Sequence, residues 1–179
     1  MSVPTIETPR LILRGWRDDD VDEWARMSAD PRVMEFYPDV YDRARSESSA
    51  ARMRAGLERD GYGLWAVERK DNGRFAGIIG INDIPYDVPF VPAREIGWRL
   101  AFDAWGHGYA TEGAAAALDF AFSRVGWDEV VAMTSLLNLR SQRVMERLGM
   151  LRDRSADFDH PHVPEGHRLK RHVLYRIKR

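Results

Sequence analysis

Trp105-Gly-His-Gly-Tyr-Ala-Thr-Glu-Gly-Ala-Ala-Ala-Ala-Leu118 is a glycine-punctuated loop that runs into a series of small residues. It follows an extended segment, 94–100, and its alanines predict a helix slim enough to lie close to a sheet. Gly106 and Gly108 permit a positive φ and a close approach of the backbone to a ligand. The first turn of a helix offers N–H groups without partners and the positive end of the helix dipole, so it binds phosphate without a basic side chain. The segment therefore predicts a pyrophosphate site.

Two familiar phosphate-binding loops are excluded by their spacing. A nucleoside-triphosphate loop requires GxxxxGK[ST], and the chain contains no Gly-Lys-Ser or Gly-Lys-Thr. A dinucleotide loop, GxGxxG, requires glycine where this chain has Thr111, in a βαβ unit with an acidic residue further on. Neither loop fits.

The pattern that fits is [Gln/Arg]-x-x-Gly-x-[Gly/Ala], the coenzyme A loop of the Gcn5-related N-acetyltransferase (GNAT) superfamily, which the chain resembles. Gly108 and Ala110 match the pattern, whereas Trp105 stands where that family has Gln or Arg. The resemblance to the RimJ/RimL-type branch continues outside the loop, in the right order along nearly the whole chain. It is carried by Ile6-Glu-Thr-Pro-Arg-Leu-Ile-Leu-Arg14, Asn138-Leu-Arg-Ser-Gln-Arg-Val-Met-Glu-Arg-Leu-Gly149 and His172-Val-Leu-Tyr-Arg-Ile177.

The resemblance implies an α/β (α+β) GNAT fold. Its mixed, mostly antiparallel sheet would have six to seven strands, about four flanking helices and a splay at the coenzyme site. Periodicity and turn residues predict the elements. Strands are expected over 5–15, 63–68, 74–82, 94–100, 129–136, 150–158 and 170–177. Helices are expected after a cap at Asp18 or Asp19, and over 46–59, 111–125 and 139–148.

Composition is that of an ordinary globular protein. The chain has 179 residues, 44% hydrophobic and 31% charged, and we expect a single domain over 1–179. A formal net charge of −1 favours neither nucleic-acid nor membrane binding. The chain contains no cysteine, which excludes disulfides and a cysteine nucleophile and suits a reducing cytoplasm. With no apolar run of membrane-spanning length and no signal-peptide core, a cytoplasmic location is expected.

The resemblance also implies how acetyl-CoA would be held. Main-chain groups of Trp98, Arg99 and Leu100 would pair with pantetheine. The pyrophosphate would meet the N–H groups of the loop, contributed by His107, Gly108, Tyr109, Ala110 and Thr111. A catalytic role for the His107 ring is an alternative, but that position usually points to solvent.

The helix over 139–148 carries further contacts. Asn138 is expected to cap it, and its amide to bond the pantetheine arm as well. Many relatives place a tyrosine acid where this chain has Met145, which has no proton to give. Ser141 is therefore the candidate donor to the departing thiolate. Arg143, with Arg140, is a candidate for the 3′-phosphate or adenine end of coenzyme A, or lies on a solvated helix face.

Glu95 is the candidate base. In a strand it shares a face with Gly97, which leaves space beside it for an acceptor, and an apolar setting raises a carboxylate pKa. A glutamate in this strand resembles the proposed base of RimL-type enzymes. The alternative is a carboxylate neutralised by Arg94 or Arg99.

The expected activity is acetyl transfer from acetyl-CoA to a primary amine, on a protein N-terminus or a small molecule, directly in a ternary complex. An acidic groove, for which the acidic residues over 18–23 are candidates, would favour a polycationic acceptor. Because Trp105 and Met145 depart from the family pattern, a non-catalytic acyl-CoA sensor is the alternative. His160 and His162, without a third ligand at suitable spacing, do not predict a metal site. A monomer or homodimer is expected.

Overall fold

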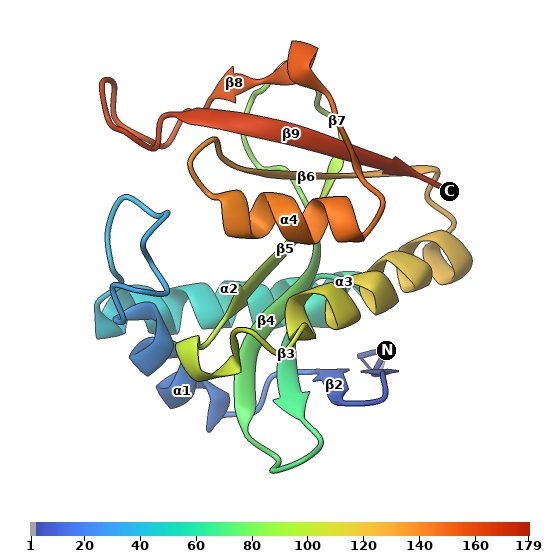
Figure 1. Cartoon of the computed structure of the whole chain (residues 1–179). Coiled ribbons are helices and arrows are strands. Elements are labelled where there is room, and N and C mark those ends of the chain that lie inside the picture. Colours follow the sequence, from blue (N-terminus) through green and yellow to red (C-terminus); the bar gives the residue numbers. More distant parts are fainter. Residues whose placement is uncertain (1–2) are drawn as a thin grey trace.

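The computed structural model describes residues 3–179, which form one mixed sheet of nine strands flanked by helices (Figure 1). The strand order is β1-β2-β3-β4-β5-β6-β9-β7, and β8 also pairs with β9. Neighbouring strands are antiparallel except β5 and β6, which are parallel. The predicted mixed, mostly antiparallel sheet is confirmed.

The elements have the following bounds. The strands are β1 (Ile6–Glu7), β2 (Leu11–Arg14), β3 (Leu64–Arg69), β4 (Phe75–Asp83), β5 (Arg94–Leu100), β6 (Glu129–Ser135), β7 (Leu151–Arg152), β8 (Phe158–Asp159) and β9 (Arg171–Lys178). The helices are α1 (Asp20–Ser28), α2 (Arg43–Asp60), α3 (Tyr109–Phe120) and α4 (Leu139–Arg147). Single helical turns occur at η1 (Phe102–Ala104), η2 (Ala121–Val125) and η3 (Arg154–Ala156).

The sheet has two more strands than the upper end of the predicted six to seven, because two predicted strands each divide. Within 5–15, the Leu11 amide donates to Thr8 Oγ1 at 2.9 Å, and this turn separates β1 from β2. Within 150–158, η3 intervenes between β7 and β8, where the Ser155 hydroxyl donates to Asp153 at 2.6 Å. Local bonds from such side chains compete with sheet pairing.

Helix starts also differ from the expected positions. Asp19 occupies the N-cap position of α1 but makes no capping bond, and Asp20 instead accepts from the amide of Arg17 at 2.7 Å. Helix α2 begins before residue 46, because Asp42 caps it by accepting from the amide of Arg45 at 2.7 Å. Helix α3 begins at Tyr109, before residue 111, directly after the left-handed Gly108.

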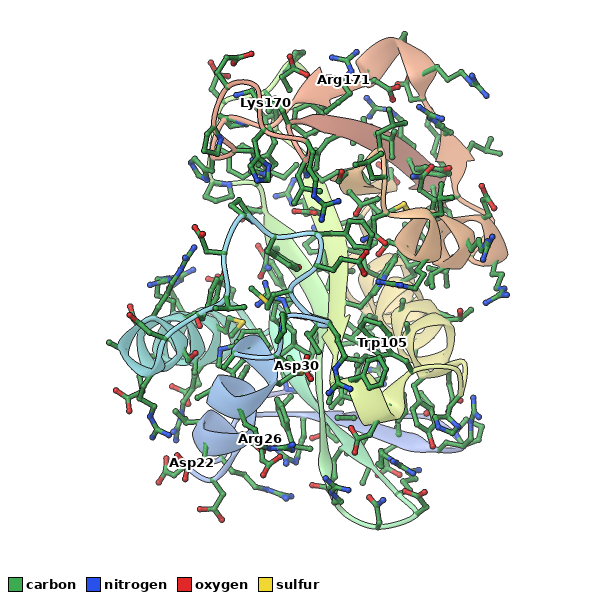
Figure 2. All side chains as sticks on the ribbon, turned by 60° about the vertical axis from the view of Figure 1, so that its left-hand side comes forward. Asp22, Arg26, Asp30, Trp105, Lys170 and Arg171 are labelled. Atoms are coloured by element: carbon green, nitrogen blue, oxygen red, sulfur yellow. The ribbon has the colours of Figure 1, made fainter. Side chains whose placement is uncertain are left out.

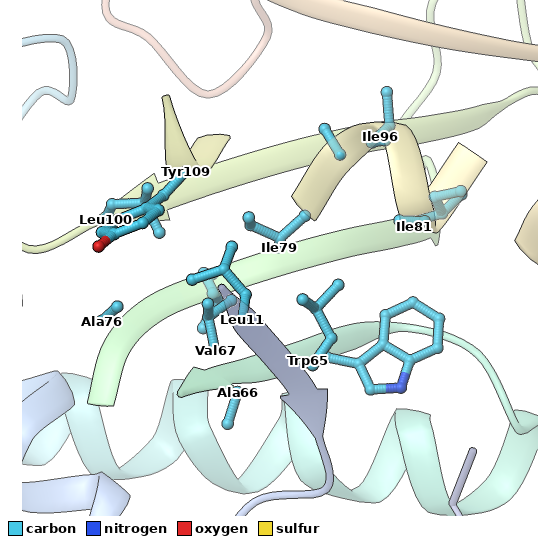
Figure 3. Close-up of a cluster of buried hydrophobic side chains, with 14 of the residues drawn as sticks. Leu11, Trp65, Ala66, Val67, Ala76, Ile79, Ile81, Ile96, Leu100 and Tyr109 are labelled. Atoms are coloured by element: carbon cyan, nitrogen blue, oxygen red, sulfur yellow. The ribbon is translucent and has the colours of Figure 1, made fainter. Parts of the chain in front are cut away.

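Part of the core lies between the sheet and α3, as Figure 3 shows for Leu11, Trp65 and Ile79, and further core residues come from α1 and α2. All three are fully buried. A Cβ added at Gly113 would meet Ile79 Cδ1 at 2.4 Å, so α3 packs closely on the sheet and a larger residue there would require the Ile79 side chain to move. The small residues of this helix therefore bring its N-terminus close to the end of β5.

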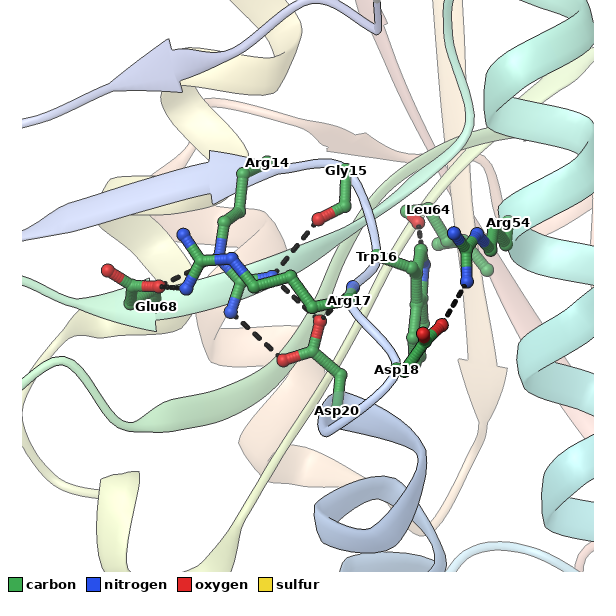
Figure 4. A network of polar contacts seen from close by, with 9 residues as sticks. All are labelled: Arg14, Gly15, Trp16, Arg17, Asp18, Asp20, Arg54, Leu64 and Glu68. Carbon is green, nitrogen blue, oxygen red and sulfur yellow. Dashed lines mark hydrogen bonds and ion pairs between the residues drawn. The ribbon is translucent and has the colours of Figure 1, made fainter.

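A buried ionic cluster connects β2, α1 and β3 (Figure 4). Arg14 donates to both carboxylate oxygens of Asp20, at 2.7 and 2.9 Å, and to Glu68 at 2.8 Å. The side chains of Arg14 and Asp20 are only 9% and 5% exposed. Such a bidentate pair fixes the position of α1 relative to β2. Loss of the Asp20 carboxylate would leave the buried Arg14 charge without this partner.

The sheet divides between β5 and β6. Their register contains one pairing, Glu95 with Val131, whereas β4 pairs with β5 along the whole strand. In Figure 1 the part of the sheet with β6, β8 and β9 lies above the part with β3 and β4, and β5 passes between them. Along the rest of β5 one edge is therefore free of a neighbouring strand. No helix within residues 3–179 has the length and apolarity needed to cross a membrane.

Candidate active site

A cavity of about 660 Å³ opens where β5 separates from β6. Its walls come from β5, the loop before α3, the first turns of α3 and α4, β6, and the segments that contain Phe36, Tyr86 and His160. The candidate residues of the sequence converge here. Those that line the cavity are Glu95, Trp98, Arg99, Leu100, Gly108, Tyr109, Ala110, Thr111, Asn138, Ser141 and Arg143. Of the predicted set, only His107 is outside the lining.

The start of α3 has the backbone of an anion site. Gly108 adopts a left-handed conformation with φ of 78° at the N-cap, and no side chain caps the helix. The first N–H groups of α3 are thus left for a ligand at the cavity wall, which Gly108, Ala110 and Thr111 line. The exposed His107 ring stacks beside Tyr109, with centroids 5.4 Å apart.

Arg10 and Glu112 hold this loop from behind. Arg10 Nη1 donates to the His107 carbonyl at 2.8 Å, and Arg10 Nε donates to Glu112 at 2.6 Å. Glu112 also accepts from Thr8 Oγ1 at 2.6 Å. Burial opposes ionisation of Glu112, but the hydrogen bonds from Thr8 and Arg10 hold its pKa below the usual range. Sequence reasoning missed this contact because about 100 residues separate the partners.

Trp105 connects the loop to the end of β5. Its indole N–H donates to the Leu100 carbonyl at 2.9 Å, and its ring packs against Phe102 with centroids 5.1 Å apart. The guanidinium of Arg140 lies over the same ring at 4.7 Å. An indole therefore fills the position of the family Gln or Arg, and one Leu100 acceptor site is already engaged.

Glu95 is the one carboxylate that lines the cavity. Among the described residues it has no ion pair, since Arg94 pairs instead with Asp83 at 3.1 Å and Arg99 pairs with no carboxylate. Burial raises the pKa of Glu95 to about 7. The carboxylate is therefore not half of an ion pair and can take up a proton near neutral pH.

The start of α4 presents Ser141 to the cavity. Asn138 Oδ1 accepts from the Ser141 amide at 3.2 Å, as expected of an N-cap, and Asn138 Nδ2 donates to Thr134 Oγ1 at 3.0 Å. The Ser141 hydroxyl makes no hydrogen bond within the described part of the chain. Met145 is buried (2% exposed) beneath it, so Ser141 is the hydroxyl on this wall of α4.

Arg140 and Arg143, the candidates for the 3′-phosphate or adenine end of coenzyme A, differ in their ion pairing. Arg140 forms an ion pair with Glu35 and lies over the Phe36 ring at 5.3 Å. Arg143 is exposed at the cavity wall and forms no ion pair with residues 3–179. Arg143 is thus the freer cation for a phosphate.

A group of residues near Glu95 was not predicted. His160 Nε2 lies 3.0 Å from the Tyr86 hydroxyl, which donates to Met133 Sδ at 3.3 Å, and the tilted rings of His160 and His172 have centroids 4.7 Å apart. Burial, with neighbouring positive groups, lowers the pKa of His160 to about 4, so its ring is neutral at pH 7. Burial and the charge of Glu95 raise the pKa of Tyr86. Nothing local in the proline-rich segment over 85–92 indicated this placement.

The acidic residues at the start of α1 do not line the cavity. Asp20 is bound to Arg14, while Asp18 and Asp22 pair with Arg54 and Arg43. Figure 2 shows Asp22 at the lower margin of the molecule, on the outer side of α1. In the described residues, no group of three His, Cys, Asp or Glu side chains is arranged to hold a metal ion.

These groups together fit a coenzyme A thioester and an acceptor. An uncapped helix start suits a pyrophosphate, a free strand edge suits an amide-containing arm, and the Ser141 hydroxyl and the Glu95 carboxylate belong to residues that line the same cavity. The arrangement can hold an acyl donor, accept a proton at Glu95 and donate a hydrogen bond from Ser141.

Comparisons with known proteins agree with this geometry. The acetyltransferase (GNAT) domain family matches residues 10–151. The Bacillus subtilis protein YkkB is 32% identical over 144 residues, which cover 80% of this chain and 83% of YkkB. An acetyltransferase structure from Agrobacterium tumefaciens has a TM-score of 0.79 and 29% identity, covering 100% of this chain and 96% of that one.

RimJ of Mycobacterium smegmatis, solved in complex with a CoA disulfide, has the same fold. Its TM-score is 0.77 at 21% identity, and the match covers 99% of this chain and 90% of RimJ. The family match extends over most of the chain, and the structure places a helix start, a carboxylate and a serine around one cavity. The chain therefore belongs to the GNAT family and is an acetyl-CoA-dependent N-acetyltransferase.

Proposed function

We propose that the enzyme transfers acetyl to a primary amine directly, in a ternary complex of enzyme, acetyl-CoA and acceptor. The observation that carries this is Glu95, a carboxylate in the cavity without an ion pair and with its pKa raised to about 7 by burial. A base of this pKa removes the proton of an ammonium near neutral pH, either directly or through a water molecule. The neutral amine then attacks the thioester carbonyl carbon.

Ser141 is the proposed donor to the departing sulfur. As the C–S bond breaks, its hydroxyl would donate a hydrogen bond to the thiolate, which then takes a proton from solvent. The chain has no cysteine, so no thiol of its own forms an acyl-enzyme. The coenzyme positions proposed for the loop, β5, Asn138 and Arg143 rest on the cavity lining and on the CoA-bound RimJ of the same fold.

The acceptor is proposed not to be a polycation. Glu95 is the only carboxylate that lines the cavity, against Arg99, Arg140, Arg143 and Arg147. The acidic residues at the start of α1 do not line the cavity, and Asp18, Asp20 and Asp22 form ion pairs with arginines instead.

The experiment is release of free thiol from acetyl-CoA, read with a chromogenic disulfide, across a panel of amines. The panel contains peptides with varied N-terminal residues, amino acids, polyamines and aminoglycosides. Because the chain has no cysteine, it adds no thiol background. Release that depends on one class of amine supports the proposal.

A non-catalytic acyl-CoA sensor is the rival, raised by Trp105 and Met145. The double variant Glu95→Gln/Ser141→Ala separates the two when thiol release and coenzyme binding by calorimetry are both measured. Turnover by the wild type that disappears in the double variant, with coenzyme still bound, eliminates the sensor. Coenzyme binding without turnover on any amine would favour it.

A further inference from the structure

Arg99 occupies the same face of β5 as the proposed base. Side chains alternate along a strand, so Glu95, Gly97 and Arg99 share one face, and Ile96 and Leu100 are buried on the other. A Cβ added at Gly97 would meet nothing within 4 Å. The face therefore has a carboxylate at one end, a guanidinium at the other and open space between them.

The guanidinium of Arg99 has aromatic neighbours, and two of its three nitrogen atoms have no hydrogen-bond partner in the described residues. Its central carbon lies 3.9 Å from the ring centroid of Tyr37, 4.9 Å from that of Trp24 and 5.2 Å from that of Tyr41. Nε and Nη1 are fully covered yet donate to no atom in the described residues. Nothing within residues 3–179 forms an ion pair with Arg99, although most arginines of the chain have one.

Aromatic rings stabilise the faces of a guanidinium but not its N–H groups. These donors point outward in the guanidinium plane, and an unpaired buried donor costs free energy. Arg99 remains charged at every accessible pH, so the charge cannot be removed by deprotonation. Because Arg99 is among the residues that line the cavity, a partner for its unbonded nitrogen atoms can come from the cavity.

We propose that Arg99 is the anion subsite for the acceptor, and that the acceptor is a primary amine that also carries a carboxylate. The amine would lie at Glu95 and the carboxylate at Arg99, matching the two charges of the strand face. This inference rests on the proposed function, because it names the acceptor class of the same cavity. A planar guanidinium is suited to a carboxylate, which it binds through two parallel hydrogen bonds.

The spacing sets the size of the acceptor. Residues four apart on a strand have Cα atoms about 13 Å apart, and the two long side chains shorten the gap between their charged ends. The amine and carboxylate of the acceptor are therefore expected to be separated by several atoms. An α-amino acid such as glycine is too short to span the two groups.

The first experiment follows the Arg99 side chain without requiring turnover. The Nε–H resonance of Arg99 is assigned by its loss in Arg99→Lys, in protein saturated with coenzyme A. The protein is then titrated with 4-aminobutyrate, 6-aminohexanoate or 6-aminohexanamide. A saturable downfield shift with an amino acid, absent with the amide, supports the subsite. No shift with either carboxylate, or an equal shift with the amide, overturns it.

The second experiment measures selectivity. Thiol release is compared for each ω-amino acid and its amide, which differ in charge but scarcely in shape. The wild type is expected to favour the carboxylate by about 10- to 100-fold in kcat/KM, the scale of a charge-assisted bidentate contact. Arg99→Gln should reduce this ratio to about threefold or less, and Arg99→Lys should retain part of it.

Arg94→Gln is the matched control, since Arg94 lies on the same strand but pairs with Asp83 outside the cavity. Its selectivity ratio should equal that of the wild type, and thermal melting of each variant checks folding. A wild-type ratio near one, with real turnover, overturns the subsite but leaves the proposed function intact. Failure to acetylate any amine, with an Arg99 resonance that still responds to carboxylates alone, overturns the proposed function but leaves the anion subsite.

Discussion

Glu95 lies opposite Val131 in the single pairing that joins β5 to β6. The candidate base is therefore at the point where the two parts of the sheet separate. Beyond Glu95, towards Leu100, β5 has no pairing with β6, and its residues line the cavity on that side. The proposed base and the strand edge proposed for the acyl donor therefore belong to one short segment, so small changes along β5 are expected to affect proton transfer and coenzyme binding differently.

The pH dependence of turnover reports Glu95. Because burial raises its pKa to about 7, the base is protonated below pH 7 and kcat/KM should rise as pH increases through about 7. In Glu95→Gln this rise should disappear and kcat should fall by about 10²- to 10⁴-fold, the usual contribution of a general base. Steady-state rates from pH 5 to 9 check this. A Glu95→Gln variant with the same rise in kcat/KM would assign it to another group.

The same carboxylate makes stability depend on pH. Between about pH 4.5 and 7 the folded protein holds a proton on Glu95 that the unfolded chain has lost, so this group destabilises the fold increasingly as pH rises. Glu95→Gln removes that penalty. The variant should gain about 1 to 3 kcal/mol over the wild type from pH 4.5 to pH 8. Urea unfolding at both pH values measures the difference, and a constant difference would contradict the raised pKa.

Ser141→Ala tests donation to the sulfur. Loss of a hydrogen bond formed in the transition state should lower kcat by about 10- to 100-fold. With an acyl donor whose thiol is more acidic, the decrease in kcat should be smaller, because the departing thiolate is more stable without that hydrogen bond. Ser123→Ala is the control, since the exposed Ser123 donates to the Asp119 carbonyl away from the cavity. If both acyl donors show the same defect, Ser141 acts on binding or positioning instead.

Gly108→Ala tests the helix start as the pyrophosphate site. Gly108 and Gly126 both have left-handed backbones, with φ of 78° and 83°, but only Gly108 lines the cavity. Each substitution should cost about 1 kcal/mol of stability because alanine disfavours this conformation. Gly108→Ala alone should also weaken coenzyme A binding in calorimetry. Equal coenzyme A affinity in both variants would show that the pyrophosphate does not bind at the helix start after Gly108.

Asp20→Asn tests the cluster that attaches α1 to the sheet. The change leaves the buried Arg14 without its bidentate partner, so the free energy of unfolding should fall by about 3 kcal/mol. Asp18→Asn is the control, because its contact with Arg54 is at the surface and should contribute less than about 1 kcal/mol. Chemical unfolding of the two variants gives both values. Similar losses would mean that the buried position of the pair is unimportant.

Most of the fold could be predicted from local sequence patterns, and so could the cavity wall that is proposed to bind coenzyme A. The glycine loop before a small-residue helix, the cap at Asn138 and the strand at Glu95 depend on neighbours within a few residues, and the structure has each of them. Strand division at Thr8 and at η3 was missed, because side-chain bonds there displace sheet pairing over only two or three residues.

Only the tertiary structure decided what surrounds those groups. Tyr86 and His160 are 74 residues apart and meet beside Glu95, and Arg10 reaches across 102 residues to Glu112. Alternation along the strand placed Arg99 on the face of Glu95, but nothing in the sequence revealed that its guanidinium lacks a carboxylate partner. Hydrophobic periodicity and turn-forming residues act over a few residues, so they can be recognised in the sequence. Ion pairing and burial depend on which distant segments the fold brings together, and these properties set the charges that face the cavity.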